Sequence, residues 1–157
     1  MCAGLALPLE KFDEKTIARH RLEERTLVHS DGTREVRFLF RSPKALLPVL
    51  TDGSLDIYEW GNRDNKESRL PHTGWCRVES LSSGKWNFLH PEAVVIPAAS
   101  GVEKGVWFEV PGQGIQAVKV YDEEKQPHVY MLTQPATEKY RTLTRHDREP
   151  VFTGKPI

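Results

Sequence analysis

LLPVLTDGSLDIYEW, residues 46–60, contains two apolar segments on either side of an Asp-Gly turn. Asp-Gly is typical of tight β-hairpin turns, because both central residues must adopt positive φ angles that few other residue pairs tolerate. Residues 46–50 and 55–60 are therefore expected to form two antiparallel strands joined by Thr51-Asp52-Gly53-Ser54.

The same pattern of short apolar segments separated by turn residues continues along the chain in both directions. Further strands are expected at 25–29, through Phe40 after the turn 30–33, at 93–96, at 105–110 and 115–121 on either side of the turn 111–114, and at 128–133. Helical periodicity is weak over residues 9–25 and clearer over residues 136–143, a helix that we expect to begin after Pro135. Residues 61–73 have the composition of a surface loop. Many short strands with few helices predict an α+β fold. We expect one compact domain over residues 1–157, with twisted antiparallel strands in a barrel-like arrangement and a few short helices.

Bulk properties exclude several classes of protein. The chain has 157 residues, 38% of them hydrophobic and 28% charged, which is ordinary for one soluble domain. No apolar run approaches the roughly 18 residues that a membrane-spanning helix needs, and the N-terminus lacks the pattern of a secretory signal. We therefore expect a cytoplasmic protein with no membrane partner.

The formal net charge is zero, so no global field would steer the protein toward nucleic acid. Any such binding needs a local cationic patch, and the C-terminal tail offers one. The alternative is that these are scattered charges on the solvated end of a helix. Its charged residues are Lys139, Arg141, Arg145, Arg148 and Lys155 against Asp147 and Glu149.

Cys2 has a chemical possibility that no internal cysteine has. Removal of Met1 would leave a free α-amine and a thiol on one residue. The amine has an ordinary pKa of about 7.7–8.0 and the thiol one near 8.5, so both can supply a nucleophile near neutral pH. An aldehyde would form an imine with the amine, and the sulfur would then close a five-membered thiazolidine ring. The alternative is a frayed terminus without function.

Two further residues could move protons. His146 lies in the charged segment after the predicted helix, where it could act as a general acid or base or simply be a surface histidine. Glu103 follows a strand end and small residues, which could aim its carboxylate into a pocket or leave it solvated beside Lys104. With only Cys2 and Cys76 as thiols, we expect no metal site and no cofactor. Gly112-Gln113-Gly114 is interpreted as a hairpin turn.

In combination, these segments resemble the SRAP (SOS-response-associated peptidase) family. Its members begin Met-Cys-Gly-Arg and continue with Trp-Gly-x-x-Pro, Asn-Ala-Arg-x-Glu, Pro-Ala-x-Gly-x-x-Glu and His-Asp-Arg-x-Pro segments. The resemblance extends from Cys2 to about Val151. The corresponding segments here occur in the same order: Cys2, Trp60-Gly61, Arg77-Val78-Glu79, Pro97-Ala98 with Glu103, and His146-Asp147-Arg148-x-Pro150-Val151.

The resemblance implies an abasic-site processing protein with a compact α+β fold. Cys2 would form a covalent thiazolidine link to an abasic site in single-stranded DNA, with Glu103 and His146 assisting proton transfer. Peptidase (hydrolase) or lyase side activity would accompany it. Arg77 and Arg148 would contact DNA phosphates, with Arg145 added by the cationic tail. We expect a DNA-associated monomer.

Three departures from the family pattern leave other functions open. Trp75 stands where the family has Asn, the arginine after Cys-Gly is absent, and Trp60-Gly61 lacks the following proline. Trp75 could stack on an exposed base or belong to the core. A DNA-binding module that has lost its chemistry is one alternative, and a cysteine peptidase acting on its own N-terminus or another peptide is the other.

Overall fold

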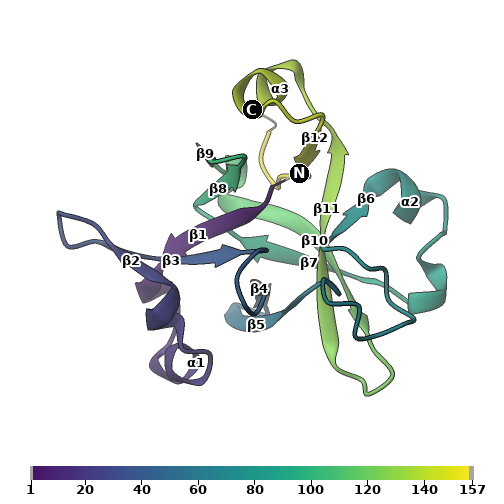
Figure 1. Ribbon diagram of the computed structural model, residues 1–157, viewed down its shortest axis with the longest axis horizontal. Helices are drawn as coiled ribbons and strands as arrows, with labels where there is room; N and C mark the ends of the chain where they lie inside the picture. The colour runs from purple at the N-terminus through teal and green to yellow at the C-terminus, as the bar shows by residue number, and fades with distance from the viewer. Residues whose placement is uncertain (1, 156–157) are drawn as a thin grey trace.

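Five strands close into a barrel in the computed structural model, which describes residues 2–155 (Figure 1). The order β10-β7-β4-β5-β11 becomes a ring because β10 also pairs with β11. The expected hairpin is confirmed, with Leu50 opposite Leu55 across the Asp-Gly turn. The barrel strands are β4 (Leu46–Thr51), β5 (Ser54–Trp60), β7 (Glu92–Pro97), β10 (Gly114–Tyr121) and β11 (Pro127–Pro135).

The expected α+β class and barrel-like arrangement are confirmed, but the strands are not all antiparallel. β11 pairs in parallel with β5 and with β6 (Trp75–Arg77). Parallel neighbours need a long crossover rather than a tight turn, and such a connection leaves no hairpin signature in the sequence. β12 (Arg148–Pro150) pairs in antiparallel register with the C-terminal end of β11, where Thr133 lies opposite Pro150.

A second sheet of five strands lies beside the barrel, in the order β2-β3-β1-β8-β9. Its central strand β1 is the N-terminal segment, which periodicity did not identify because its short apolar run is buried on both faces. The bounds are β1 (Gly4–Pro8), β2 (Thr26–Val28), β3 (Arg34–Leu39), β8 (Ser100–Glu103) and β9 (Val106–Glu109).

The hairpin expected around Gly112-Gln113-Gly114 is wrong. β9 pairs with β8, whereas β10 pairs with β7 and β11, so this turn carries the chain from one sheet to the other. The turn contains the 3-10 helix η4 (Pro111–Gln113), in which Gly112 has φ +70°. A Cβ on Gly112 would lie 2.4 Å from the Gly154 nitrogen, so the position requires glycine for backbone packing and not for a strand reversal.

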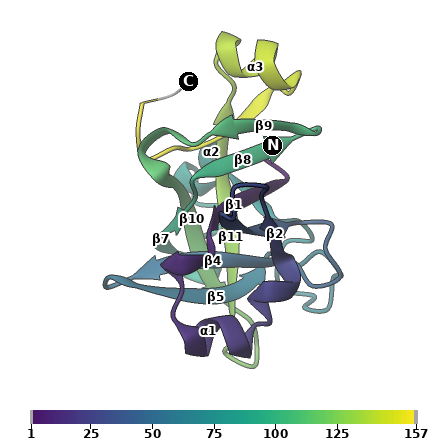
Figure 2. The same ribbon diagram turned by 90° about the vertical axis from the view of Figure 1, so that its left-hand side faces the viewer.

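Within residues 2–155, three short α-helices and four 3-10 turns complete the fold, and α1 and α3 lie at opposite ends of the molecule (Figure 2). α3 begins at Glu138 and not at Ala136, because Pro135 still pairs in β11 and the Thr137 hydroxyl accepts the Tyr140 N–H as the N-cap. No helix within the described residues is long and apolar enough to cross a membrane. The remaining elements are η1 (Leu9–Lys11), α1 (Glu14–Arg19), η2 (Leu22–Arg25), α2 (Val78–Ser82), η3 (Asn87–Leu89) and α3 (Glu138–Thr144).

Candidate functional site

Cys2 is held at the beginning of β1, between β3 and β8. The Ala3 N–H donates to the Val102 carbonyl at 2.8 Å, and the Ala3 carbonyl accepts the Phe40 N–H at 3.0 Å. The Cys2 residue is 0% exposed and its thiol donates to the Gly4 carbonyl at 2.9 Å. The interpretation of Cys2 as a frayed terminus is therefore wrong, because flanking strands on both sides order this segment.

Small residues of β8 make room for the sulfur. A Cβ on Gly101 would lie 3.1 Å from the Cys2 Sγ and 2.7 Å from the Phe108 ring. The Pro-Ala-x-x-Gly segment of the sequence thus has a steric role at this point, since any larger residue would displace the thiol or the ring.

Burial, with a smaller contribution from the negative charge of Glu103, raises the pKa of the Cys2 thiol to about 11. An apolar enclosure disfavours the thiolate, because the charged form loses its hydration. The expectation of readily available thiolate near neutral pH is therefore wrong for this folded state. At pH 7 the Cys2 sulfur carries its proton.

Glu103 and His146 form the polar side of the site. Glu103 ends β8 and is only 4% exposed, and its Oε1 lies 3.4 Å from the His146 Nε2. The His146 Nδ1 accepts the Arg148 backbone N–H at 3.1 Å, so in the neutral ring the proton resides on Nε2 and faces Glu103. The pair is thus arranged as a proton donor beside a carboxylate.

Two contacts hold the turn that carries His146. Lys104, the residue after Glu103, donates from Nζ to the Arg145 carbonyl at 2.8 Å. At the other end of α3, the fully buried Glu149 carboxylate accepts the Thr137 N–H at 2.5 Å. The α3 segment is therefore tied to both β8 and β12, which explains how residues 43 positions apart in the sequence, Glu103 and His146, meet.

Tyr140 is a site residue that the sequence did not reveal. It is 0% exposed, and its hydroxyl has no hydrogen-bond partner among the described residues. Burial raises its pKa, and the Cys2 thiol and the Glu103 carboxylate both lie near enough to raise it further. An aromatic residue in an amphipathic helix is normally a core residue, so no sequence signal distinguishes this hydroxyl.

Trp75 forms a wall next to Cys2. Its indole N–H donates to the Cys2 carbonyl at 3.1 Å. Its ring centroid lies 4.6 Å from that of Phe40 and 5.8 Å from that of Trp60. Trp75 remains partly exposed, so it belongs to the aromatic core at one edge and reaches the surface beside the site at the other.

The three predicted phosphate-binding arginines have different surroundings. Arg148 is 9% exposed and donates two hydrogen bonds to Glu79, at 2.6 and 2.9 Å, and one to the Thr133 carbonyl. This pairing lowers the pKa of Glu79 to about 2. The guanidinium of Arg148 is therefore engaged in internal hydrogen bonds that join α2 to β11 and β12. Arg77 and Arg145 are exposed.

The described residues contain no group of three or more His, Cys, Asp or Glu side chains that could hold a metal ion. The chemistry of the site is that of a thiol, a carboxylate, an imidazole and a phenol. A comparison of the chain with protein-family models and with curated proteins finds no match. The geometry of this site and the order of the sequence motifs are therefore the observations that bear on function.

Proposed function

We propose that this protein captures abasic sites in single-stranded DNA covalently through Cys2 after Met1 is removed. The observation that carries the proposal is the convergence of three segments at one place: Cys2 before β1, Glu103 at the end of β8 and His146 after α3. Glu103 and His146 are in contact, and the carboxylate lies close enough to the Cys2 thiol to influence its pKa.

The reaction begins at nitrogen. A freed Cys2 amine adds to the C1′ aldehyde of the opened abasic sugar, and loss of one water gives an imine. Because burial keeps the thiol protonated at neutral pH, the sulfur cannot compete for this first step. The order of events, amine first and sulfur second, follows from the pKa of the thiol.

Ring closure then needs a base for the thiol proton. Glu103 is the carboxylate whose charge acts on the Cys2 thiol, and it accepts this proton as sulfur adds to the imine carbon, while the imine nitrogen takes up a proton. The products are a thiazolidine and the water released earlier. As the cyclic sugar opens, the imidazolium form of His146 gives its Nε2 proton to the ring oxygen, and the C1′ hydroxyl gives its proton to Glu103, which lies against His146. On reversal both protons move back to the groups they came from.

The surroundings of Cys2 suit a single strand. The partly exposed edge of Trp75 offers a surface on which a neighbouring base can stack. Arg77 and Arg145 are exposed on the elements that flank the site and supply phosphate contacts, which makes affinity decrease as salt increases. Arg148 contributes by positioning, since its backbone N–H fixes the His146 ring and its guanidinium is paired with Glu79.

The test is adduct formation with an abasic oligonucleotide, scored on a denaturing gel after intact-mass spectrometry has shown that the chain starts at Cys2. We expect a heat-stable adduct with wild type, none with Cys2→Ala, and at least tenfold slower formation with Glu103→Gln, given the usual 10²–10⁴-fold contribution of general acid–base groups. Cys76→Ala is the matched control, because Cys76 is also a buried free thiol but has a peptide nitrogen. An adduct that forms equally well with Cys2→Ala would disprove the proposal.

The same experiment separates the alternatives. A binding module without chemistry would retain the unmodified strand in a salt-dependent manner and would give no adduct. A cysteine peptidase is disfavoured by the raised pKa of the Cys2 thiol, because amide hydrolysis by cysteine needs the thiolate. Cleavage of a peptide substrate in the absence of DNA would overturn this preference.

A further inference from the structure

A second polar region lies far from Cys2, where η2 and α1 face the loop between β3 and β4. It is a surface cavity of about 760 Å³, a size within the ordinary range for ligand sites. Figures 1 and 2 show α1 at the opposite end of the molecule from α3, the helix that precedes His146. We call this cavity the cationic groove, and define it by five side chains that line it: Arg19, His20, Arg21, Arg25 and Lys44.

The charge of the cationic groove is strongly unbalanced. Arg37 also lines the cavity, and Glu24 is the single carboxylate among the lining residues. Within residues 2–155, no ion pair is formed by Arg19, Arg21, Arg25 or Lys44, in contrast to the pairs made by Arg63, Lys119 and Arg148. In a chain of zero formal net charge, this is a local excess of positive charge in a concave surface, which focuses potential toward anions.

Arg25 forms the wall of the cationic groove. Its Nη2 donates to the Lys44 carbonyl at 2.7 Å, so the backbone holds the guanidinium in place, and the charge of Glu24 acts on it without forming an ion pair within residues 2–155. Burial lowers the pKa of Arg25, which is the physical mark of a desolvated cation. Its Nη1 is buried and has no hydrogen-bond partner among the described residues.

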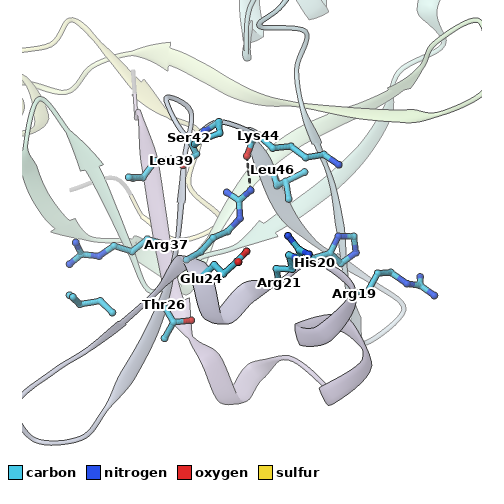
Figure 3. Close-up of a pocket in the computed structure, with 13 residues that line it drawn as sticks. Arg19, His20, Arg21, Glu24, Thr26, Arg37, Leu39, Ser42, Lys44 and Leu46 are labelled. Atoms are coloured by element: carbon cyan, nitrogen blue, oxygen red, sulfur yellow. Dashed lines mark hydrogen bonds between the residues drawn. The ribbon is translucent and has the colours of Figure 1, made fainter.

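The pKa of His20 reflects the burial and the positive charge inside the groove. Its pKa is lowered by burial first, and then by the charges of Arg19, Lys44 and Arg25, with Asp56 acting weakly in the opposite direction. Figure 3 shows the His20 ring beside Arg21 with Lys44 above them, while Arg37 extends away from this group. Arg37 instead stacks over Trp107, with its guanidinium carbon 4.5 Å from the ring centroid.

The geometry points to a second binding site in the cationic groove, for the phosphate groups of a phosphate-bearing ligand, independent of the chemistry at Cys2. Arg21, Lys44 and Arg19 are exposed and are free to turn toward a ligand, while Arg25 supplies a fixed positive charge behind them. Arginine forks and a lysine ammonium are the side chains that proteins use for phosphate oxygens. A free polyphosphate and the backbone of a nucleic-acid strand share this chemistry.

The experiment uses the full chain and the titration of His20 followed by NMR, with the signal assigned by comparison with His20→Gln. Inorganic tripolyphosphate and an unmodified oligo-dT strand are added separately. A bound phosphate compensates the cations and raises the pKa of His20, whereas His90, which lies outside the groove, serves as the internal reference. No movement of the His20 pKa with either probe would overturn the proposal, and this measurement needs no variant that must fold. A response to tripolyphosphate alone assigns the site to free polyphosphates, and a response to the strand assigns it to nucleic acid.

Affinity measurements with variants give the second arm. Arg21→Gln combined with Lys44→Gln should weaken tripolyphosphate binding about tenfold, the loss expected from two solvent-exposed ion pairs. The matched control combines Lys66→Gln and Lys125→Gln, which removes the same charge from exposed lysines elsewhere and should leave affinity within about twofold, because distant exposed charges are screened. Equal losses in the two double variants would mean nonspecific attraction and would also overturn the proposal. Because both probes lack an aldehyde, failure here would leave the capture of abasic sites at Cys2 untouched.

Discussion

The Cys2 site and the cationic groove treat polar groups in opposite ways. Around Cys2, burial and close pairing keep the reactive groups neutral or matched: the thiol retains its proton, and Glu103 lies against His146. In the cationic groove, cations gather that form no ion pairs within the described residues; burial lowers the pKa of His20, and the neighbouring positive charges lower it as well. The covalent chemistry that we propose at Cys2 needs rigid placement, whereas the phosphate binding that we propose in the groove needs unpaired positive charge. The two regions should therefore respond differently to the same kinds of perturbation.

The largest effect is expected from the aromatic wall of the Cys2 site. Trp60 is 1% exposed, donates its indole N–H to the Gly74 carbonyl at 2.8 Å, and packs against Phe40 and Trp75. Trp60→Ala should lower the free energy of unfolding by about 3–5 kcal/mol, as large core truncations do. Urea denaturation measures this change.

Trp107→Ala is the matched control for Trp60→Ala. Trp107 is 37% exposed and its main partner is the Arg37 guanidinium. Its loss should cost about 0.5–1 kcal/mol, the value of an exposed cation–π contact. Equal losses from the two tryptophans would contradict the tight packing of the aromatic wall beside Cys2.

pH should separate the two regions next. The pKa of the Cys2 thiol is raised from an ordinary 9.0 to about 11, so between these values the unfolded chain loses a proton that the folded chain keeps. Stability therefore falls as pH rises from about 9 to about 11, by on the order of 2–3 kcal/mol for a shift of this size. Cys76, whose pKa burial raises to about 12, acts in the same direction. Urea midpoints at pH 8 and pH 10.5 measure the change, and Cys2→Ala should reduce it to the part that Cys76 contributes.

The cationic groove should respond on the acid side. The pKa of His20 is lowered in the folded state from its ordinary 6.5, so its contribution is present above that pH and decreases as pH falls through it, when the unfolded chain binds the proton more readily. His20→Gln should reduce the acid sensitivity of the urea midpoint and leave the alkaline side unchanged. An alkaline slope that depended on His20, or an acid slope that depended on Cys2, would contradict this division.

Sequence patterns predicted the elements that local rules control and missed those set by distant partners. The Asp-Gly hairpin of β4 and β5 follows from turn chemistry, and the apolar runs of β10 and β11 are strands as expected. β1 was missed because its burial comes from β3 and β8, which lie far away in the sequence. The apparent hairpin at Gly112 failed because two strands on either side of a turn need not pair with each other.

The candidate site follows the same division. The order of motifs pointed to Cys2, Glu103 and His146, and the structure brings these residues together. The Glu79 pairing of Arg148 and the buried Tyr140 hydroxyl could not be predicted, since both depend on which side chains meet across the fold. The cationic groove was missed as well, because its arginines are spread over a weak helical stripe with acidic residues between them.

A smaller effect should distinguish two buried tyrosines. Tyr130 and Tyr140 are both 0% exposed, but the Tyr130 hydroxyl donates to the Pro71 carbonyl at 2.8 Å, whereas the Tyr140 hydroxyl has no partner within the described residues. Tyr130→Phe should lose about 0.5–1.5 kcal/mol of stability, the net value of one hydrogen bond. Tyr140→Phe should be neutral or slightly stabilising, because it removes a buried hydroxyl that has no well-aligned hydrogen bond among the described residues. Thermal unfolding compares them, and a larger loss from Tyr140→Phe would show that its hydroxyl is satisfied in the folded state.

The smallest effect on stability should come from the cationic groove. Arg19 is exposed, forms no ion pair within residues 2–155 and lies among other cations. Arg19→Gln removes like-charge repulsion, so the free energy of unfolding should stay within about 0.5 kcal/mol of wild type, with any change toward greater stability. The pKa of His20 should rise, because one of the charges that lowers it is gone. NMR titration of His20 and a urea curve on the same variant measure both quantities. An unchanged His20 pKa together with a clear loss of stability would mean that Arg19 forms an ion pair in solution. The groove would then lack the unpaired positive charge on which the proposed phosphate site depends.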